Sequence, residues 1–567
     1  MSKSDTFNGA EAMLEFLKIQ GTDFIFCSPI AVWAPLWEAL AKRRERGDPE
    51  TPQYVNCRHE MLAVGLASGF YKATGRPQVV LLPTGLGVLH GSMAIRSALQ
   101  ERIPLIILSP DTVTYGTEPA LDPGMEWPSL LVDFAGPARD AEVCVKWAKE
   151  VKTASELIAD LRRACYFAET VPRGPTLLSV PFEILMSPVP FVRQPKLEAH
   201  PVVAPAEQLN PIVEILTQSN NPVIITEHAG RTPEEVSTLV KLAELIAAPV
   251  FEFWLPSFQN FPRAHPLHGN GPVEAVLPEA DCIVVAGANA PWHPPLLELK
   301  EGCKVVVFEE DPLRPRAPYW GYRTDYCIAG DVGMNLAQLY SQLKERLTSP
   351  PTGRAEYWNQ YNRQSSEQAR QQTDAISTGN VVPAASLFQA LQQALPAGAA
   401  IVDEIVSQTA IMVQTLFQSK SFKQYRGWAG ALGTGLPTAL GVKLADPNNV
   451  IVCVIGDGAF SYNPIPACFG LAQQYKLPIL IVICNNQGYV SQSWNVQKYF
   501  SEGAAVRTDN YYGRVIDPTP DYWKLAEAFG GYGERVSAPE ALAPAIQRGL
   551  AAMADGRFAV LDVLVTP

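Results

Sequence analysis

Two stretches of the sequence place acidic and amide side chains directly after apolar runs. Asp457 stands between Gly456 and Gly458 in "VIGDGAFSYN", where a run of Val, Ile and Cys stops. A second apolar run, "LPILIVIC", stops in the same abrupt way at Asn485 and Asn486. Ligands of open parallel sheets bind beyond the carboxyl ends of the strands, where loops lead into helices. Both stretches therefore mark candidate binding positions.

The residue types at these two strand ends predict metal chemistry. Carboxylate and amide oxygens are ligands that Mg²⁺ or Ca²⁺ prefers, and Mg²⁺ usually bridges a carboxylate to phosphate oxygens. Gly456 and Gly458 lack a Cβ, so their backbone amides can approach a phosphate closely. Taken singly, each stretch is more typical of a simple turn or a helix cap. Taken together, they predict a phosphorylated cofactor held through a metal ion.

"GDGAF" followed by "NNQGY" resembles the thiamine diphosphate signature that pyruvate decarboxylase, benzoylformate decarboxylase and acetolactate synthase share, with a slightly longer interval between the motifs. The resemblance implies that Asp457 and Asn486 bind Mg²⁺ together with the backbone carbonyl of Gly488, and the neighbouring Asn485 is a further candidate ligand. It also implies cofactor contacts from the other residues of the two motifs and from "VDEIVSQT": Gly456, Gly458, Ala459, Gly488, Tyr489 and Ser407.

The same resemblance extends to the groups that activate the cofactor. "CRHEMLAVGLASGFYKATGRP" carries Glu60, which would hydrogen-bond the aminopyrimidine ring and favour the tautomer that removes the thiazolium C2 proton. "GWAGALGTGLPTALGVKLA" resembles the loop that bends the cofactor, with Leu432 as the apolar wedge and the Gly430 carbonyl as an acceptor. Without the resemblance, Glu60 would be interpreted as a solvated residue in the first turn of a helix.

The residues that distinguish the family's members differ here from those of the known decarboxylases. "CSPIAVWAP" places Ile30 and Ala31 where relatives carry a Pro-Gly or Ala-Gly pair, and Leu81 stands where benzoylformate decarboxylase has a histidine. The Asp and adjacent histidines of pyruvate decarboxylase are not evident. We expect an apolar substrate pocket, in which low polarity favours decarboxylation, lined by Ile30, Ala31, Trp33, Leu86 and Val490.

Two histidines lie near these motifs and have more than one interpretation. His90 follows the glycine turn of "TGLGVLHG" and could protonate a reaction intermediate. It could equally cap the following helix or lie hydrogen-bonded in the core. His59 has the same alternatives. In the middle third, "FQNFPRAHPLHGNGP" carries His265 and His268, either of which could line the cleft.

Helical and strand-like patterns alternate along the chain, which predicts α/β domains with parallel sheets. We expect three doubly wound domains: a pyrimidine-binding domain over residues 1–187, a central Rossmann-like domain over 205–347 and a diphosphate-binding domain over 375–567. A Pro-rich passage without strands, Pro188–Pro211, is predicted to link the first two. The polar, Gln-rich residues 348–374 are predicted to form the second boundary.

Composition restricts the classes of binding partner and the cellular compartment that we expect. The 567 residues carry a formal net charge of −12 and no long basic run, which argues against nucleic acid or an anionic membrane as a partner. The first residues lack the apolar core of a signal peptide, and no apolar run is long enough for a membrane span. The ten cysteines form no CxxC pair and several lie in apolar runs, which favours a reducing cytoplasm.

The sequence therefore predicts a thiamine diphosphate- and Mg²⁺-dependent enzyme that acts on 2-oxo acids. An acetolactate synthase-like carboligase is favoured, with a decarboxylase that releases an aldehyde or a flavin-linked oxidase as alternatives, and a non-catalytic relative as a rival. FAD or ADP in the central domain is not expected, although the acidic "VFEEDPLRP" follows a strand there. The resemblance implies a homodimer or homotetramer, with Glu60 of one chain and Asp457 of its partner sharing a cofactor.

Overall fold

The structure of the protein is a computed structural model, which describes residues 6–48, 52–112, 122, 124–126, 128, 130, 133–252, 256–293, 297–315, 321–347, 349, 351–374, 381–417, 420–427 and 429–566. The chain divides into two compact units. Unit 1 comprises Met1–His200, Gly427–Pro447 and Ser461–Leu477, and unit 2 comprises Pro201–Arg426, Asn448–Phe460 and Pro478–Pro567.

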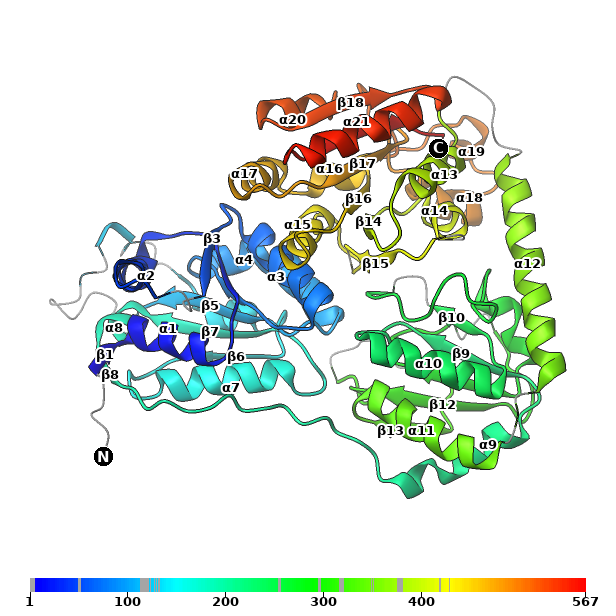
Figure 1. The fold of residues 1–567 in the computed structure, drawn as a ribbon, viewed down its shortest axis with the longest axis horizontal. Helices are drawn as coiled ribbons and strands as arrows, with labels where there is room; N and C mark the ends of the chain where they lie inside the picture. The colour runs from blue at the N-terminus through cyan, green and yellow to red at the C-terminus, as the bar shows by residue number, and fades with distance from the viewer. Residues whose placement is uncertain are drawn as a thin grey trace. The chain divides into compact units, whose positions relative to one another are not determined.

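Unit 1 is built on a 6-stranded parallel sheet in the order β3-β2-β4-β5-β7-β6. Side chains of alternate strand residues pack with α1, α2 and α7 into one core. α3 packs on β2 and β4, and α4 packs on α3 (Figure 1). The strands are β2 (Phe24–Cys27), β3 (Gln53–Asn56), β4 (Val79–Leu81), β5 (Ile106–Asp111), β6 (Trp147–Glu150) and β7 (Thr176–Pro181). The helices are α1 (Gly9–Ile19), α2 (Ala34–Glu45), α3 (Glu60–Thr74), α4 (Gly85–Gln100), α6 (Pro137–Ala141), α7 (Leu157–Glu169) and α8 (Phe182–Met186).

Two helices from the last third of the chain also belong to unit 1, α15 (Gly435–Ala445) and α17 (Ile465–Tyr475). α15 packs directly on α3, because small residues face one another along both helices. A Cβ on Gly65 would collide with Pro437, and one on Gly69 would collide with the backbone of Thr438. This close approach fixes the position of the loop that precedes α15 relative to the start of α3.

Unit 2 contains two further parallel sheets (Figure 1). The central sheet has the order β10-β9-β11-β12-β13 and packs against α9, α10 and α11. Its strands are β9 (Pro222–Thr226), β10 (Val250–Glu252), β11 (Cys282–Ala286), β12 (Lys304–Glu309) and β13 (Tyr326–Ala329). Its helices are α9 (Asn210–Gln218), α10 (Pro233–Ile246), α11 (Val332–Arg346) and α12 (Thr352–Asp374).

The third sheet has the order β15-β14-β16-β17-β19-β18, and one of its faces packs on α13, α14 and α21. Its strands are β14 (Ala400–Glu404), β15 (Lys423–Arg426), β16 (Ile451–Gly456), β17 (Leu480–Asn485), β18 (Tyr532–Val536) and β19 (Ala559–Leu564). The helices are α13 (Ala384–Ala394), α14 (Thr409–Leu416), α16 (Asp457–Tyr462), α18 (Gln492–Tyr499), α19 (Ala504–Arg507), α20 (Lys524–Ala528) and α21 (Leu542–Ala554). Three parallel-sheet α/β domains are therefore confirmed.

The predicted linker is not free of strands. Pro188–Pro190 forms β8, which pairs antiparallel with β1 (Thr6–Asn8), and α9 already begins at Asn210. Proline is tolerated in a two-stranded ribbon because one edge of each strand needs no partner. The burial of Val189 and the edge contact between the rings of Phe7 and Phe191 hold β8 in place.

The predicted second boundary is helical. Residues 352–374 form α12, which is polar in composition but has residues that are buried. Trp358 packs into the core of the central sheet, and one turn later Asn362 donates to the carbonyl oxygen of Pro266 and accepts from the backbone N–H of Asn270. The start of the predicted diphosphate-binding domain, residue 375, lies outside the described residues.

All ten cysteines are free thiols, and nine of them are buried. Burial raises the pKa of thiols such as Cys27, to about 12, so they behave as small apolar side chains. In the part of the chain that the structure describes, none of the helices combines the length and apolar character needed to cross a membrane.

Candidate active site

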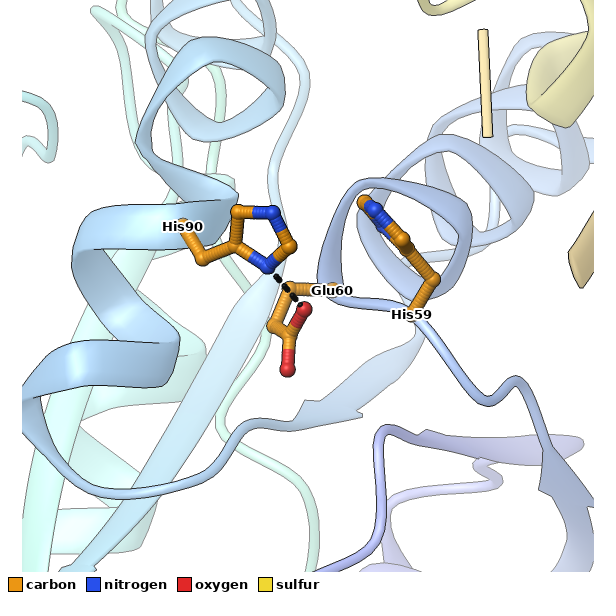
Figure 2. A group of neighbouring side chains, drawn as sticks. All are labelled: His59, Glu60 and His90. Carbon is orange, nitrogen blue, oxygen red and sulfur yellow. Dashed lines mark hydrogen bonds and ion pairs between the residues drawn. The ribbon is translucent and has the colours of Figure 1, made fainter. Parts of the chain in front are cut away.

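Three neighbouring strands of unit 1 bring polar side chains to one edge of the sheet. Ser28 directly follows β2, Glu60 is the first residue of α3 after β3, and His90 lies in the second turn of α4 after β4. The strand order β3-β2-β4 makes these three strand ends neighbours. Figure 2 shows Glu60 between His59 and His90, with the dashed line joining it to His90.

The Glu60 carboxylate has a partner on each oxygen. Ser28 Oγ donates to Oε1 over 2.9 Å, and His90 Nδ1 lies 2.6 Å from Oε2. The backbone of Ser28 is itself fixed, because its N–H donates to the Leu81 carbonyl over 3.0 Å. Gly91 of α4 lets the two helices approach, since a Cβ there would lie 3.3 Å from Cβ of Glu60. The carboxylate is therefore enclosed, and 13% of the side chain is exposed.

His90 is neither a helix cap nor a core residue, so both of these alternatives are wrong. The predicted glycine turn is the first turn of α4, which begins at Gly85, and His90 lies inside the helix. Its side chain is 60% exposed while its Nδ1 contacts Glu60. Of the predicted roles, proton transfer is the one that this position permits.

His59 is the N-cap of α3. Its Nδ1 accepts the backbone N–H of Met61 over 3.2 Å, and its ring lies 4.6 Å from that of His90. Burial lowers the pKa of His59, and the neighbouring His90 lowers it further while Glu60 opposes the shift. Because Nδ1 accepts the Met61 N–H, the ring proton of His59 lies on Nε2.

The three residues His59, Glu60 and His90 have the ligand types of a zinc site, with donor atoms within 4.8 Å of one another. The cap argues against that use. Nδ1 of His59 already accepts a hydrogen bond, so Nε2 carries the proton and binds a metal only if the cap breaks.

The loop that carries Gly430 and Leu432 lies against the first turn of α3. Gly433 adopts φ +107°, and a Cβ there would lie 2.8 Å from Cε of Met61, the neighbour of Glu60. The loop is closed by a hydrogen bond from Thr434 Oγ1 to the Gly427 carbonyl. Leu432 is half-buried and Gly430 is exposed. Unit 1 thus brings the predicted wedge loop to the predicted catalytic glutamate.

One residue that was predicted to line the apolar substrate pocket lies in the core instead. Trp33 is fully buried in the core beneath β2, and its indole N–H donates to the Leu82 carbonyl over 3.1 Å, so it lines no pocket. Ile30 is half-buried, Ala31 is exposed and Leu86 is 71% exposed. These three residues of unit 1 and the half-buried Val490 of unit 2 stay predictions for the substrate pocket.

In unit 2, Asp457 follows β16 as the first residue of α16 and is buried. The backbone N–H of Gly488 donates to its Oδ2 over 2.9 Å. Burial raises the pKa of Asp457 to about 6, against the effect of the N–H groups of Gly458 and Gly488. A buried carboxylate of this kind gains from a cation beside it.

Asn486 completes a cluster of three oxygens. Its amide oxygen faces two other acceptors, Asp457 Oδ1 at 3.2 Å and the Gly488 carbonyl at 2.7 Å, while its amide nitrogen faces Gln408 Nε2 at 3.0 Å. Without a cation, exchanging the amide oxygen and nitrogen would satisfy all three neighbours. With the oxygens converging, carboxylate, amide and carbonyl form the hard ligand set of Mg²⁺. The residues present therefore fit the ion that the motifs predict.

Asn485 does not face this cluster. Its amide oxygen accepts the backbone N–H of Gln487 over 3.1 Å, and its amide nitrogen donates to Asp562 Oδ1 over 2.8 Å. Asp562 is in turn paired with Arg535. Of the two predicted asparagines, Asn485 thus has a structural role, and Asn486 faces Asp457.

The glycines of the two motifs differ in what surrounds them. A Cβ on Gly458 would collide with the Tyr489 ring, and one on Gly488 with the Arg514 carbonyl. A Cβ on Gly456 would meet no atom within 4 Å, so open space adjoins the backbone beside Asp457. Ala459 is buried, and Ser407 is half-buried in the turn after β14.

Comparison with known proteins finds three family domains in order along the chain. Residues 7–127 match the thiamine pyrophosphate enzyme N-terminal TPP binding domain, residues 209–339 its central domain and residues 406–563 its C-terminal TPP binding domain. The chain belongs to the thiamine pyrophosphate enzyme family.

Relatives within this family carry more than one activity in their names. The chain is 25% identical to the acetolactate synthase large subunit of Haemophilus influenzae, over 95% of this chain and 91% of the relative. It is 26% identical to the benzoylformate decarboxylase of Pseudomonas aeruginosa, over 95% and 96%. The thiamine diphosphate-dependent 4-hydroxybenzoylformate decarboxylase of Rhodococcus jostii superimposes with a TM-score of 0.76 at 24% identity, covering 99% of both chains, which shows the shared fold.

In the central domain of this thiamine pyrophosphate enzyme, the acidic segment after β12 is paired with an arginine of the same domain. Arg314 donates to Glu309 over 2.9 Å and to the Ala288 carbonyl over 2.7 Å. Arg314 and Glu309 border a cavity of about 10 Å³, which has room for one water molecule. Glu309 is buried and faces the guanidinium, so this carboxylate is paired within the central domain.

The histidines predicted to line the cleft also have partners within the central domain. His268 is buried, with Nε2 3.3 Å from Glu252 Oε2, so its predicted role is wrong. Although burial opposes ionisation, Arg263 and His268 hold the pKa of Glu252 at about 2. His265 lies 3.2 Å from Glu244.

Sequence reasoning missed two polar residues that contact the predicted site. Ser28 bonds Glu60, and Gln408 faces Asn486. Both follow the carboxyl end of a parallel strand, β2 and β14, and a search for polar residues at every such end would have found them.

Proposed function

We propose that this thiamine pyrophosphate enzyme uses Mg²⁺ and thiamine diphosphate to cleave and form C–C bonds of 2-oxo acids, with an acetolactate synthase-like carboligation favoured. The observation that carries the proposal is the Glu60 carboxylate, held by Ser28 and His90 at the start of α3 beside the loop of Leu432. When bound, the cofactor supplies a nucleophilic carbon that adds to a carbonyl and accepts the electrons of the broken C–C bond.

The diphosphate end is assigned to unit 2. Asp457 Oδ1, Asn486 Oδ1 and the Gly488 carbonyl would ligate Mg²⁺, which neutralises phosphate charge. Ser407, Ala459, Gly458 and Tyr489 are proposed to contact the cofactor. The open space beside Gly456 offers room for a phosphate against the backbone.

The pyrimidine end is assigned to unit 1. Glu60 would hold a proton on Oε1 or Oε2 and donate it to the aminopyrimidine ring, which makes the cofactor's own amino group the base. Leu432 would separate the two rings of the cofactor, and the Gly430 carbonyl would accept from the amino group. The enclosure of Glu60 keeps water away from this exchange.

The preference for carboligation depends on the residues around the substrate. Leu81, where benzoylformate decarboxylase has a histidine, is fully buried in β4 and donates no proton. His90 is the remaining candidate for proton transfer, and its Nδ1 already contacts Glu60. With Leu81 apolar and His90 paired with Glu60, we expect protonation of the nucleophilic carbon to be slower than its addition to a second carbonyl.

Product analysis tests the proposal. Purified protein with thiamine diphosphate and Mg²⁺ is offered 2-oxo acids with and without an aldehyde or second 2-oxo acid. A hydroxyketone or acetohydroxy acid is expected. Free aldehyde with CO₂ would replace carboligation by decarboxylation, and the absence of reaction with every donor would contradict the 2-oxo acid assignment. Because Arg314 and Glu309 pair with one another, we expect a colourless protein without flavin.

We also propose a homodimer or homotetramer, with the cofactor held between Glu60 of one chain and Asp457 of another. Sedimentation velocity measures the assembly. Mixing Glu60→Gln and Asp457→Asn proteins is then expected to restore activity in hybrid dimers, because one of the two shared sites keeps both residues. A monomeric active protein would contradict this arrangement.

A further inference from the structure

The histidine beside Glu60 suggests a route for protons that the proposed function leaves open. Glu60 must release and regain a proton in each catalytic cycle, yet its side chain is only 13% exposed. The question is which neighbouring group connects the carboxylate to solvent.

One side of the carboxylate leads inward. Ser28, the partner of Oε1, is buried, and its backbone is fixed to Leu81. The close approach of α3 and α4 at Gly91 encloses the Cβ of Glu60. A proton that moved towards Ser28 would therefore reach no solvent.

The other carboxylate oxygen, Oε2, contacts the imidazole of His90. His90 Nδ1 is 2.6 Å from Oε2 (Figure 2), and in the single chain the His90 side chain is 60% exposed. Its ring thus has one nitrogen on the enclosed carboxylate, and the side chain reaches solvent. An imidazole can accept a proton at one nitrogen and release one from the other.

His59 does not offer a second route. Its ring lies 4.6 Å from His90, but its Nδ1 accepts the backbone N–H of Met61 and its Nε2 carries the proton of the neutral ring. Burial, and then the neighbouring His90, lower the pKa of His59, which disfavours protonation of its ring. His59 packs against one side of the His90 ring.

We propose that His90 is the proton shuttle of Glu60, connecting its carboxylate with solvent. In release, the proton of the Glu60 carboxyl passes to Nδ1 of His90 and the Nε2 proton leaves to water. In uptake, water protonates Nε2 and the Nδ1 proton returns to Glu60. The two directions retrace one path, so protons balance over a cycle and the ring need not flip.

The proposal rests on the proposed function, and its test separates the two. The first measurement uses the apoprotein with [¹⁵N]histidine, in which NMR reports the tautomer of each of the seven histidines. His90→Gln assigns the His90 signals. We expect a protonated Nδ1 on His90 in the wild-type protein and a changed tautomer balance in Glu60→Gln. Unchanged His90 signals in that variant would overturn the pairing, whatever the enzyme catalyses.

The second measurement follows hydrogen–deuterium exchange at C2 of thiamine diphosphate bound with Mg²⁺. We expect His90→Ala to slow exchange by about 10²-fold, with unchanged cofactor affinity, and added imidazole to restore part of the rate. Leu89→Ala, on the same exposed side of α4, is the matched control and should exchange like wild type. Wild-type exchange in His90→Ala, or a slow rate that imidazole leaves unchanged, would overturn the shuttle. A wild-type protein that does not accelerate exchange would instead contradict the proposed function.

Discussion

The two halves of the proposed site are built on the same plan but fixed by different means. Each uses the carboxyl ends of three neighbouring parallel strands, β3-β2-β4 around Glu60 and β14-β16-β17 around Asp457. Around Glu60 the contacts join side chains, from Ser28 and His90. Around Asp457 the backbone contributes directly, through the N–H and carbonyl of Gly488.

This difference indicates separate tasks. A site fixed by backbone groups holds one geometry, which suits a metal ion with strict coordination demands. A site fixed by ionisable side chains can change its charge without moving the chain, which suits proton transfer. The comparison predicts that substitutions in the Glu60 region change rates and that those in the Asp457 region change cofactor affinity.

Glu60→Gln is expected to have the largest effect, and it tests whether the Glu60 region controls reaction rates. Glutamine keeps an acceptor for Ser28 but cannot take up a proton, so cofactor activation should slow by about 10²–10⁴-fold. Exchange at C2 of the bound cofactor measures the rate, and titration calorimetry measures affinity. We expect affinity to change little. A large loss of affinity with normal exchange would reverse the roles given to the two regions.

Asn486→Ala and Asn485→Ala form a matched pair in the other region. Removing Asn486 takes away one proposed oxygen ligand, and we expect the affinity for Mg²⁺ in the presence of cofactor to fall by about 10–100-fold. Removing Asn485 leaves Asp562 with one donor fewer and should cost stability, about 1–3 kcal/mol, while the affinity for Mg²⁺ changes little. Mg²⁺ titrations monitored by cofactor binding, with thermal unfolding alongside, measure both. The opposite pattern would make Asn485 the ligand.

These two regions also differ in how far the sequence could predict them. The cluster around Asp457 is built from two short motifs, one with Asp457 and one with Asn486 and Gly488. Backbone groups of these motifs contribute directly, so the motifs could be recognised in the sequence. Ser28 and Gln408 reach the site from other strands, and only packing decides their rotamers. Residue type alone does not separate the two asparagines, because the contact of Asn485 with Asp562 and that of Asn486 with Asp457 are not local in the sequence.

The fold was predictable where apolar runs and turns alternate, and less so where composition conceals burial. β8 lies in a Pro-rich passage, and Val189 is fixed by contacts that no local pattern shows. α12 is polar overall, yet Trp358 anchors it to the central core. The pairing of Arg314 with Glu309 likewise depends on strand ends meeting in space.

Two glycine variants test whether the space beside Asp457 receives the diphosphate. Gly456→Ala places a methyl group where no atom lies within 4 Å, so stability should stay within about 0.5 kcal/mol of wild type while cofactor affinity falls. Gly458→Ala collides with the Tyr489 ring and should lose about 1–3 kcal/mol of stability. Thermal unfolding of the apoproteins and cofactor titration separate the effects. Wild-type cofactor affinity in Gly456→Ala would place the diphosphate elsewhere.

His59 offers the smallest and most local test, because it supports the Glu60 region by capping α3. His59→Ala removes the acceptor of the Met61 N–H and should lower the local stability of the first turn by about 1 kcal/mol. His59→Asn restores an acceptor that does not titrate. Hydrogen exchange of peptides that contain the start of α3, monitored by mass spectrometry, reports the opening of this turn.

The pH dependence distinguishes the cap from a charged role. Burial lowers the pKa of His59 below its ordinary value of 6.5, so below that pH the unfolded segment binds more protons than the folded one. The stability of the turn should therefore be fully present above pH 6.5 and fall as the pH drops below it. His59→Asn should remove this fall while matching wild type at pH 8. If the wild-type turn instead became more stable on acidification, His59 would be protonated in the folded state, which would contradict the cap that its Nδ1 forms with the Met61 N–H.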